Sequence, residues 1–488
     1  MARLLTRFAR AVRVAPDRPA VRSGDRTLTF AELDRRSAVL AAGLVGRGVR
    51  RGDLVGVCLP RGVDLMVALL GVWRSGAAYV PLDPAYPAAR LAAMAQAARL
   101  TAVVHDGPVP DWAGCAVVVP PDGDGGGDGG DGGVDGDPGA AFSDDTVEGP
   151  AYAIFTSGSS GPPKGVLVTH ANVAALVTAL ETAGVYGERL GVVAWNASVS
   201  FDASVKQWVR VCRGDTVVVL DDLDRFDPER LRALLDRHAV TDLDLTPTHW
   251  EILREELLPP AADGRVLRLL MGGEAVPERT WREIAAAPGL EGINVYGPTE
   301  CTVDATAARM AGERPNLGTA LPGVRLSILG GDVGELCIAG PQVALGYLGA
   351  PGLTASKFVP EPGGEGTRRY RTGDLVRRLP DGEYEYLGRA DRQVKWRGVR
   401  IELGEIEDRL RECAGVASAA VTVSGERLLA HVVPTVPAAS DDRVPTPRDL
   451  ARHLADRLPE TMLPSKIVLV DALPVTVNGK LDLAALAH

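Results

Sequence analysis

The chain is expected to fold as an α/β protein with a smaller domain at its carboxyl end, and three observations predict this. Apolar runs typical of buried strands alternate with helix-like stretches as far as Tyr296. Short strands and turns dominate from Gly334 onward. The length of 488 residues provides for roughly three domains of ~150 residues each.

An amphipathic first helix is expected over Met1–Val14, because Ala15-Pro16-Asp17-Arg18-Pro19 ends it and a strand pattern follows at once. The buried strand candidates then follow as Leu54–Leu59, Val117–Val119, Val192–Trp195, Thr216–Leu220, Val266–Leu270 and Ile293–Tyr296. Later short strands are expected at Glu335–Ile338 and Glu383–Leu387. This alternation of strands and helices indicates the α/β class.

The end of the chain has a pattern of its own. A hairpin is predicted from Ala417–Val423 and Leu428–Val433, which flank a Ser-Gly-Glu turn. A helix is predicted over Pro447–Arg457, with Thr446 as its N-cap. We therefore expect a core domain over residues 1–390 and a small domain over residues 391–488.

Composition excludes several classes of partner. The hydrophobic fraction of 46% and the charged fraction of 24% are ordinary for a soluble globular protein. The formal net charge of -10 argues against nucleic acid or an anionic membrane as a partner. No apolar run approaches the ~18 residues of a spanning helix. The six cysteines form no C-x-x-C pair, which favours reduced thiols and a cytoplasmic location.

The segment 122–137 is almost entirely glycine and aspartate. Such a composition cannot bury apolar surface, and a disordered surface loop is expected. Calcium binding is the alternative, since carboxylates spaced by glycines also occur in calcium-binding repeats. One irregular copy without repeated apolar positions argues against that alternative.

The stretch from Thr156 to Gly165 is a candidate phosphate-binding loop. Its glycines allow a close approach of backbone N–H groups to a ligand, and its hydroxyls and lysine suit phosphate oxygens. The candidate contacts are Thr156, Ser157, Gly158, Ser159, Ser160, Gly161 and Lys164. Apolar runs on both sides predict a strand–loop–strand, and Pro163 departs from the Walker A pattern. Taken alone, such a loop is also compatible with a flexible turn.

Further motifs accompany this loop in a fixed order. They are LTFAEL at 28–33, GAAYVPLD at 76–83, FDAS at 201–204, NVYGPTE at 294–300, YRTGDL at 370–375, GRADRQVK at 388–395 and NGKLD at 478–482. With this set the chain resembles the adenylate-forming superfamily, specifically the adenylation domains of nonribosomal peptide synthetases. The resemblance covers nearly the whole chain.

The resemblance implies a fold and a reaction. The fold is a large N-terminal domain of two α/β subdomains plus a distorted β-barrel, followed by a small mobile α+β domain with its hinge at Asp391. The reaction has two halves: an amino acid and ATP give an aminoacyl-adenylate and pyrophosphate, and a carrier protein then accepts the aminoacyl group on its phosphopantetheine thiol. We expect that carrier to be charged in trans. An MbtH-like protein is a further partner that many family members require.

The resemblance also implies the catalytic and nucleotide-binding residues. Bringing a carboxylate to the α-phosphate concentrates negative charge, so the site needs cations and N–H donors. The matching positions are Lys480 as the catalytic lysine, Glu300 as the magnesium ligand, Thr299 as an AMP contact, Tyr296 against adenine, and Asp374 and Arg389 at the ribose. The loop from Thr156 to Lys164 would hold the β- and γ-phosphates.

The amino acid pocket is implied in the same way. Its positions are Asp202, Ala203, Lys206, Asp244, Leu270, Gly272, Val295, Val303, Asp304 and Lys480. Asp202 matches the partner of the substrate's α-ammonium, which favours an amino acid over the acyl or aryl acid of a CoA ligase. An enclosed lysine needs an anion, so Lys206 favours L-glutamate. Glutamine or ornithine remains open, because Asp244 and Asp304 could already neutralise Lys206.

Overall fold

A computed structural model describes residues 4–107, 109–120, 149–158, 161–261, 263–364, 366–396, 399–425, 427–435, 445–474 and 486. Ser159, Ser160, Lys480 and the segment 122–137 lie outside the described residues, as do the side chains of Ser157, Gly158 and Gly161. For these positions the roles given above stay predictions.

The chain divides into two compact units. The first comprises Met1–Pro84, Ala95–Ile154 and Gly165–Ala390, and the second comprises Ala85–Met94, Phe155–Lys164 and Asp391–His488. The second unit thus contains the expected small domain together with two stretches from the expected core domain. The boundary between residues 390 and 391 stays a prediction, and these two stretches depart from it.

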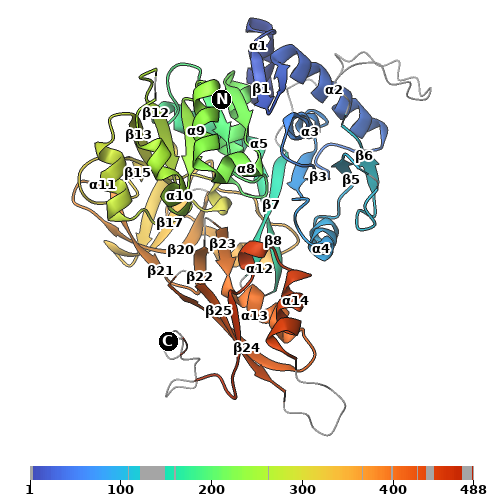
Figure 1. The fold of residues 1–488 in the computed structure, drawn as a ribbon, viewed down its shortest axis with the longest axis vertical. Helices are drawn as coiled ribbons and strands as arrows, with labels where there is room; N and C mark the ends of the chain where they lie inside the picture. The colour runs from blue at the N-terminus through green and yellow to red at the C-terminus, as the bar shows by residue number, and fades with distance from the viewer. Residues whose placement is uncertain are drawn as a thin grey trace. The chain divides into compact units, whose positions relative to one another are not determined.

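A nine-stranded sheet organises the first unit (Figure 1). Its strands, in sheet order, are β15 (Thr319–Ala320), β14 (Thr306–Arg309), β13 (Leu290–Tyr296), β12 (Leu267–Met271), β11 (Asp242–Leu245), β9 (Val192–Trp195), β10 (Thr216–Val219), β1 (Pro19–Ser23) and β2 (Arg26–Thr29). The six strands from β13 to β1 are parallel, and the outer strands are antiparallel. All four strands predicted in this region, from Val192 to Tyr296, are present.

A second sheet has seven strands, and all but one of them come from the amino-terminal half of the chain. It runs β18 (Gly346–Tyr347), β8 (Gly161–Thr169), β7 (Pro150–Gly158), β4 (Ala78–Pro81), β3 (Leu54–Cys58), β5 (Ala102–His105) and β6 (Ala116–Val118). The predicted strand–loop–strand is present as β7 and β8, but these strands extend into the candidate phosphate loop: β7 runs to Gly158 and β8 begins at Gly161.

A third sheet of five antiparallel strands follows. It consists of β16 (Arg325–Leu329), β17 (Val333–Ala339), β19 (Phe358–Pro360), β20 (Arg368–Arg378) and β21 (Tyr384–Arg389). Two α/β sheets and a third, all-antiparallel sheet agree with the fold class that the sequence predicts.

The helices of this part of the chain are α1 (Leu4–Val14), α2 (Phe30–Gly46), α3 (Val63–Arg74), α4 (Ala88–Ala98), α5 (His170–Thr182), α6 (Ala203–Trp208), α7 (Arg210–Arg213), α8 (Asp222–Phe226), α9 (Pro228–Arg237), α10 (Pro247–Leu257), α11 (Glu278–Ala286) and α12 (Pro351–Lys357). Because side chains alternate along a strand, β10 contributes Val217 and Val219 to one core and Val218 to another. The helices α3 and α5 pack in the first core, and α9, α10 and α11 pack in the second.

The second unit has a smaller core of its own. It contains the hairpin β22 (Gln393–Trp396) and β23 (Val399–Glu402), the helices α13 (Leu403–Arg411) and α14 (Pro447–Ala455), and the sheet of β24 (Val416–Ser424), β25 (Arg427–Pro434) and β26 (Lys466–Leu469). The predicted hairpin is confirmed as β24 and β25. Thr446 caps α14 as predicted, in a capping box with Asp449. Along the described parts of the chain, no helix is long and apolar enough to cross a membrane.

Candidate active site

The expected amino acid pocket residues gather at one edge of the nine-stranded sheet. Asp244, Leu270 and Val295 lie on the parallel strands β11, β12 and β13 near their carboxyl ends. The helix α6 follows β9 and carries Ala203 and Lys206. In open α/β sheets, ligands bind outside the carboxyl ends of the parallel strands. The position of these residues therefore suits a binding site.

The close approach of two strands at this edge explains Gly272. A Cβ atom at this position would lie 2.6 Å from the carbonyl oxygen of Val295, which is closer than Cβ atoms come to such an oxygen in proteins. A glycine therefore lets the chain leaving β12 pass directly against β13. Leu270, Val295 and Val303 are buried together in the main core.

Lys206 forms a buried cluster with two carboxylates. Its Nζ atom lies 3.0 Å from Asp244 Oδ1 and 3.2 Å from Asp304 Oδ2. Lys206 is 4% exposed and Asp304 is 3% exposed. Burial alone would lower the pKa of Lys206, but the charges of Asp244 and Asp304 outweigh it and raise the pKa above its usual value. Lys206 is therefore a permanent cation within this cluster.

Asp202 lies directly before α6 and keeps some accessible surface, so a ligand group can reach it. The protein around it nevertheless raises the pKa of its carboxyl by burial, while a hydrogen bond with Thr299 and the charge of Lys206 act in the opposite direction. A carboxylate in such surroundings gains from a cationic partner, and the α-ammonium of an amino acid would supply one.

The turn after β13 carries four expected site residues. Thr299 and Glu300 lie in a short 3-10 helix, and Asp304 follows two residues with left-handed backbone, Thr302 (φ 56°) and Val303 (φ 71°). Positive φ in a β-branched residue is strained, and such strain concentrates at functional sites. At Gly297 a Cβ would lie 2.4 Å from the carbonyl oxygen of Val303, so a glycine is needed there for the chain to fold back.

The donor set around Glu300 fits a magnesium ion. Glu300 is fully buried, and its Oε1 accepts a hydrogen bond of 2.7 Å from the Tyr347 hydroxyl. Magnesium is commonly held by one or two carboxylates together with substrate phosphates and water. The described residues contain no group of three or more acidic, histidine or cysteine side chains arranged for a metal. A carboxylate such as that of Glu300 would hold such an ion together with the phosphates of ATP.

The expected ribose and adenine residues contact one another. Tyr296 donates a hydrogen bond of 2.6 Å to Asp374 Oδ2, and Arg389 Nη1 lies 2.6 Å from Asp374 Oδ1. Asp374 is 2% exposed. Both of its carboxylate oxygens are engaged, so a ribose hydroxyl would have to replace or share one of these contacts.

The expected phosphate loop belongs to the second unit. Thr156 Oγ1 donates to the carbonyl oxygen of Lys164 at 3.5 Å, and Lys164 Nζ lies 3.3 Å from Glu402 Oε1. Gln393 also donates to Glu402. The expected hinge residue Asp391 accepts a hydrogen bond of 3.3 Å from the Gln393 backbone N–H. Lys164 is therefore ion-paired in this structure.

Several residues that support α6 were missed by sequence reasoning. The Tyr186 hydroxyl donates 2.7 Å to the carbonyl oxygen of Lys206, and Gln207 Oε1 accepts from the backbone N–H groups of Asn196 and Ala197. Arg61 donates to three carbonyl oxygens at the ends of β9 and β10. These contacts join segments far apart in sequence, so a local motif could not have revealed them.

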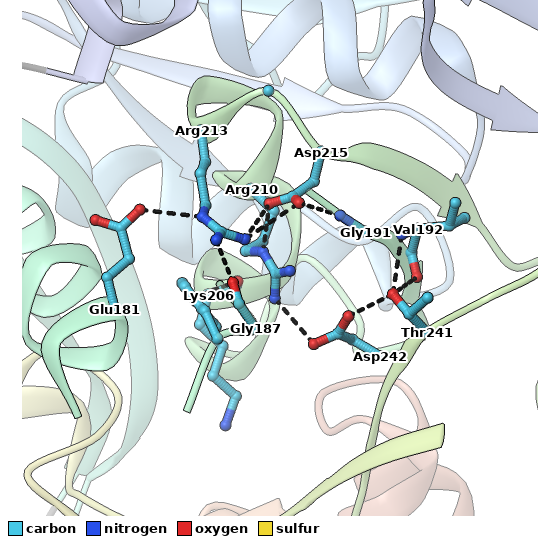
Figure 2. Close-up of polar contacts among 12 residues, drawn as sticks. Glu181, Gly187, Gly191, Val192, Lys206, Arg210, Arg213, Asp215, Thr241 and Asp242 are labelled. Atoms are coloured by element: carbon cyan, nitrogen blue, oxygen red, sulfur yellow. Dashed lines mark hydrogen bonds and ion pairs between the residues drawn. The ribbon is translucent and has the colours of Figure 1, made fainter. Parts of the chain in front are cut away.

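A buried ion network lies beside Lys206 (Figure 2). Arg210 Nε lies 2.7 Å from Asp215 Oδ2, and Arg210 Nη1 lies 3.4 Å from Asp242 Oδ1. The Arg210 guanidinium also stacks on the Tyr186 ring, 4.1 Å from its centroid. All three charged side chains are nearly inaccessible. Arg210 thus connects the strands of the sheet with the helix pair that carries Lys206.

Replacing Arg210 by methionine is expected to lower the free energy of unfolding by about 3 kcal/mol, the lower end of the cost of breaking a buried ion pair. Asp215 and Asp242 would each lose one arginine and keep another, Arg213 and Arg268 respectively. Urea denaturation measures the change.

The matched control is Arg230→Met, which removes an exposed ion pair with Asp224 and should change the free energy of unfolding far less, because water and salt screen such a pair. Equal losses in the two variants would contradict the structural role of Arg210.

Two family profiles match the chain. That of the AMP-binding enzyme family matches residues 8–348, and that of the AMP-binding enzyme C-terminal domain matches residues 405–480. Phosphinothricin tripeptide synthetase PhsC of Streptomyces viridochromogenes is 38% identical over 493 residues, which cover 96% of this chain and 44% of that protein. The dapdiamide synthesis protein DdaD of Enterobacter agglomerans is 35% identical over 482 residues, covering 96% of this chain and 78% of that protein.

A solved structure is similar over the whole chain. It is holo-PA1221, a nonribosomal peptide synthetase protein containing adenylation and PCP domains, bound to a vinylsulfonamide inhibitor. The TM-score is 0.79 at 26% identity, and the match covers 99% of this chain and 84% of that one. Five other curated relatives are much longer, and the chain spans less than a fifth of the length of each.

Proposed function

This chain belongs to the AMP-binding enzyme family, among the adenylation domains of nonribosomal peptide synthetases, and on that premise we propose that it activates an α-amino acid with ATP. The observation that carries the proposal is Asp202, a partly accessible carboxylate in protein-enclosed surroundings beside the Lys206 cluster. It would bind the α-ammonium of the substrate and leave the α-carboxylate to react.

In the proposed first half-reaction, an oxygen of the α-carboxylate forms a bond to the α-phosphorus, and the bond from that phosphorus to pyrophosphate breaks. Lys480 would bridge the two reacting groups, and Thr299 would hydrogen-bond to the AMP part. Glu300 would hold Mg²⁺, which supplies charge neutralisation for the phosphates when bound. Tyr296, Asp374 and Arg389 would position adenine and ribose.

In the proposed second half-reaction, the phosphopantetheine thiol of a carrier protein attacks the carbonyl carbon and releases AMP. The similarity to a structure with adenylation and PCP domains supports a carrier as partner. We propose that the carrier acts in trans. An MbtH-like protein remains a further proposed partner.

We propose L-glutamate as the amino acid. An ammonium group has three N–H donors, and the ammonium of Lys206 uses two of them for its ion pairs with Asp244 and Asp304. A third donor is left for a ligand, and a side-chain carboxylate is its strongest partner.

One observation favours a second candidate. The cluster of Lys206, Asp244 and Asp304 holds one cation and two carboxylates, and it therefore has a formal charge of -1 when both acids are ionised. A cationic side chain such as that of ornithine would neutralise it. Glutamine, which is uncharged, would fit without any change in charge.

Amino-acid-dependent ATP–pyrophosphate exchange tests the proposal. The panel comprises the proteinogenic amino acids and ornithine, each with and without an MbtH-like protein. We expect exchange led by glutamate. Exchange led by ornithine or glutamine would keep the reaction and replace the substrate. A panel without any exchange, together with acyl- or aryl-CoA formation, would contradict amino acid activation.

A further inference from the structure

Two ion pairs form neighbouring rungs between one helical segment and one strand. Lys206 pairs with Asp244, and Arg210 pairs with Asp242. On the helical side, Lys206 and Arg210 are four residues apart across the junction of α6 and α7, where Val209 keeps helical backbone angles. On the strand side, Asp242 and Asp244 are two residues apart on β11 and therefore point to the same face of the sheet. The two spacings match, since each separates the side chains by about 6 Å.

Tyr186 connects the two rungs a second time. The Arg210 guanidinium stacks on the Tyr186 ring, 4.1 Å from its centroid, and the Tyr186 hydroxyl donates a hydrogen bond of 2.7 Å to the carbonyl oxygen of Lys206. Both Tyr186 and Arg210 are 2% exposed. Arg210 therefore helps to fix the ring that holds the backbone of Lys206, and the position of the Lys206 ammonium depends on it.

The two rungs belong to ion clusters of opposite formal charge. The Lys206 cluster holds one cation and two carboxylates, which gives -1 when both acids are ionised. The Arg210 network holds three arginines and two acids, which gives +1 (Figure 2). Its members are Arg210, Arg213, Arg268, Asp215 and Asp242. The outer two arginines also pair with acids nearer the surface, and each of those acids pairs with a further arginine, so the net charge stays the same. The network thus offsets the excess carboxylate of the cluster.

This offset matters for an anionic substrate. A glutamate side chain would bring one more carboxylate to Lys206, and buried negative charge without compensation is strongly unfavourable. In the protein interior a positive charge one rung away is screened far less than it would be in water. Asp244 shows the same influence, since burial raises the pKa of its carboxyl while the charges of Lys206 and Arg210 act in the opposite direction.

We propose that Arg210 is a positioning residue for glutamate, which holds Lys206 against Asp244 and supplies, one rung away, the positive charge that compensates the substrate's side-chain carboxylate. Lys206 makes the contact with the substrate, and Arg210 acts through Lys206. Glutamine has an uncharged side chain and would not gain from this charge. The inference rests on the proposed glutamate activation.

The experiment compares the wild-type enzyme with Arg210→Met. It measures kcat and KM for glutamate in ATP–pyrophosphate exchange, together with the competitive inhibition constant of glutamine. A unit charge at this distance contributes on the order of tenfold, so we expect the glutamate KM to rise about tenfold. The kcat for glutamate and the glutamine constant should change by less than about threefold.

The comparison of the two ligands separates this role from a purely structural one, because a general loosening of the fold would weaken both alike. Equal changes in the glutamate and glutamine constants would overturn the inference and leave glutamate activation standing. Absence of glutamate-dependent exchange in the wild-type enzyme would instead overturn the proposed function. The control is Arg230→Met, which removes an exposed ion pair with Asp224 and should leave both constants unchanged.

The conservative variant Arg210→Lys tests the charge itself. It keeps the cation and loses the planar fork that contacts two acids. We expect its glutamate KM to lie within about threefold of the wild-type value. A KM as high as that of Arg210→Met would contradict the role of the charge.

A further variant decides the question even where Arg210→Met does not fold. In Asp242→Asn the side chain keeps its shape, and the amide oxygen can still accept a hydrogen bond from Arg210. The network gains one net positive charge, so the ratio of the glutamate KM to the glutamine constant should fall by at least about threefold. An unchanged or higher ratio would overturn the inference.

Discussion

Replacing Lys206 by methionine is expected to lower kcat/KM for glutamate by about 10²–10³, because the substrate carboxylate would enter a buried site that has lost its cation. Breaking such a pair costs about 3–5 kcal/mol. Methionine keeps most of the side-chain volume, so the change removes charge rather than packing. ATP–pyrophosphate exchange with varied glutamate measures the effect.

Two controls accompany this variant. Glutamine carries no charge, so its kcat/KM should change by less than about tenfold in Lys206→Met. Lys466→Met removes an exposed lysine from β26 and should leave both substrates unchanged. Glutamate turnover within about tenfold of the wild-type rate in Lys206→Met would refute the pairing.

Replacing Lys480 by alanine is expected to lower kcat for adenylation by about 10²–10³, the scale of one charged transition-state contact. The proposed lysine bridges the attacking carboxylate and the α-phosphate, where negative charge concentrates in the reaction. ATP binding should persist, because the proposed ribose and adenine contacts come from Tyr296, Asp374 and Arg389. Equilibrium binding of ATP and exchange rates are measured on the same preparation.

The same Lys466→Met variant serves as the control for a general loss of a lysine. A Lys480→Ala enzyme with a near-normal rate would refute the catalytic role. A variant that loses ATP binding as well would show that Lys480 holds the nucleotide rather than the transition state.

The elements of the fold could be predicted because their signals are local. Apolar runs marked β9, β10, β12 and β13 of the nine-stranded sheet, and Thr446 followed by a proline marked the start of α14. The meeting of Lys206, Asp244 and Asp304 could not be predicted in this way. The three residues come from a helix, a strand and a strained turn, and only the sheet topology brings them together.

The residues that support α6 were even harder to predict from the sequence. Arg210 and Tyr186 lie in unremarkable stretches of sequence, and an arginine is more often solvated than buried. Their roles depend on tertiary pairing with Asp215, Asp242 and the Lys206 carbonyl oxygen. The resemblance to a family indicated which residues line the pocket, but it did not indicate the buried ion network of Arg210, Asp215 and Asp242 beside the pocket.

The most direct test of the account is a crystal structure of the enzyme with a non-hydrolysable sulfamoyl analogue of glutamyl-adenylate. We expect the α-ammonium within hydrogen-bond distance of Asp202, and the side-chain carboxylate in contact with Lys206 Nζ. A side-chain carboxylate that points away from Lys206, with the ion cluster unchanged from the free enzyme, would contradict the central claim that this lysine selects glutamate.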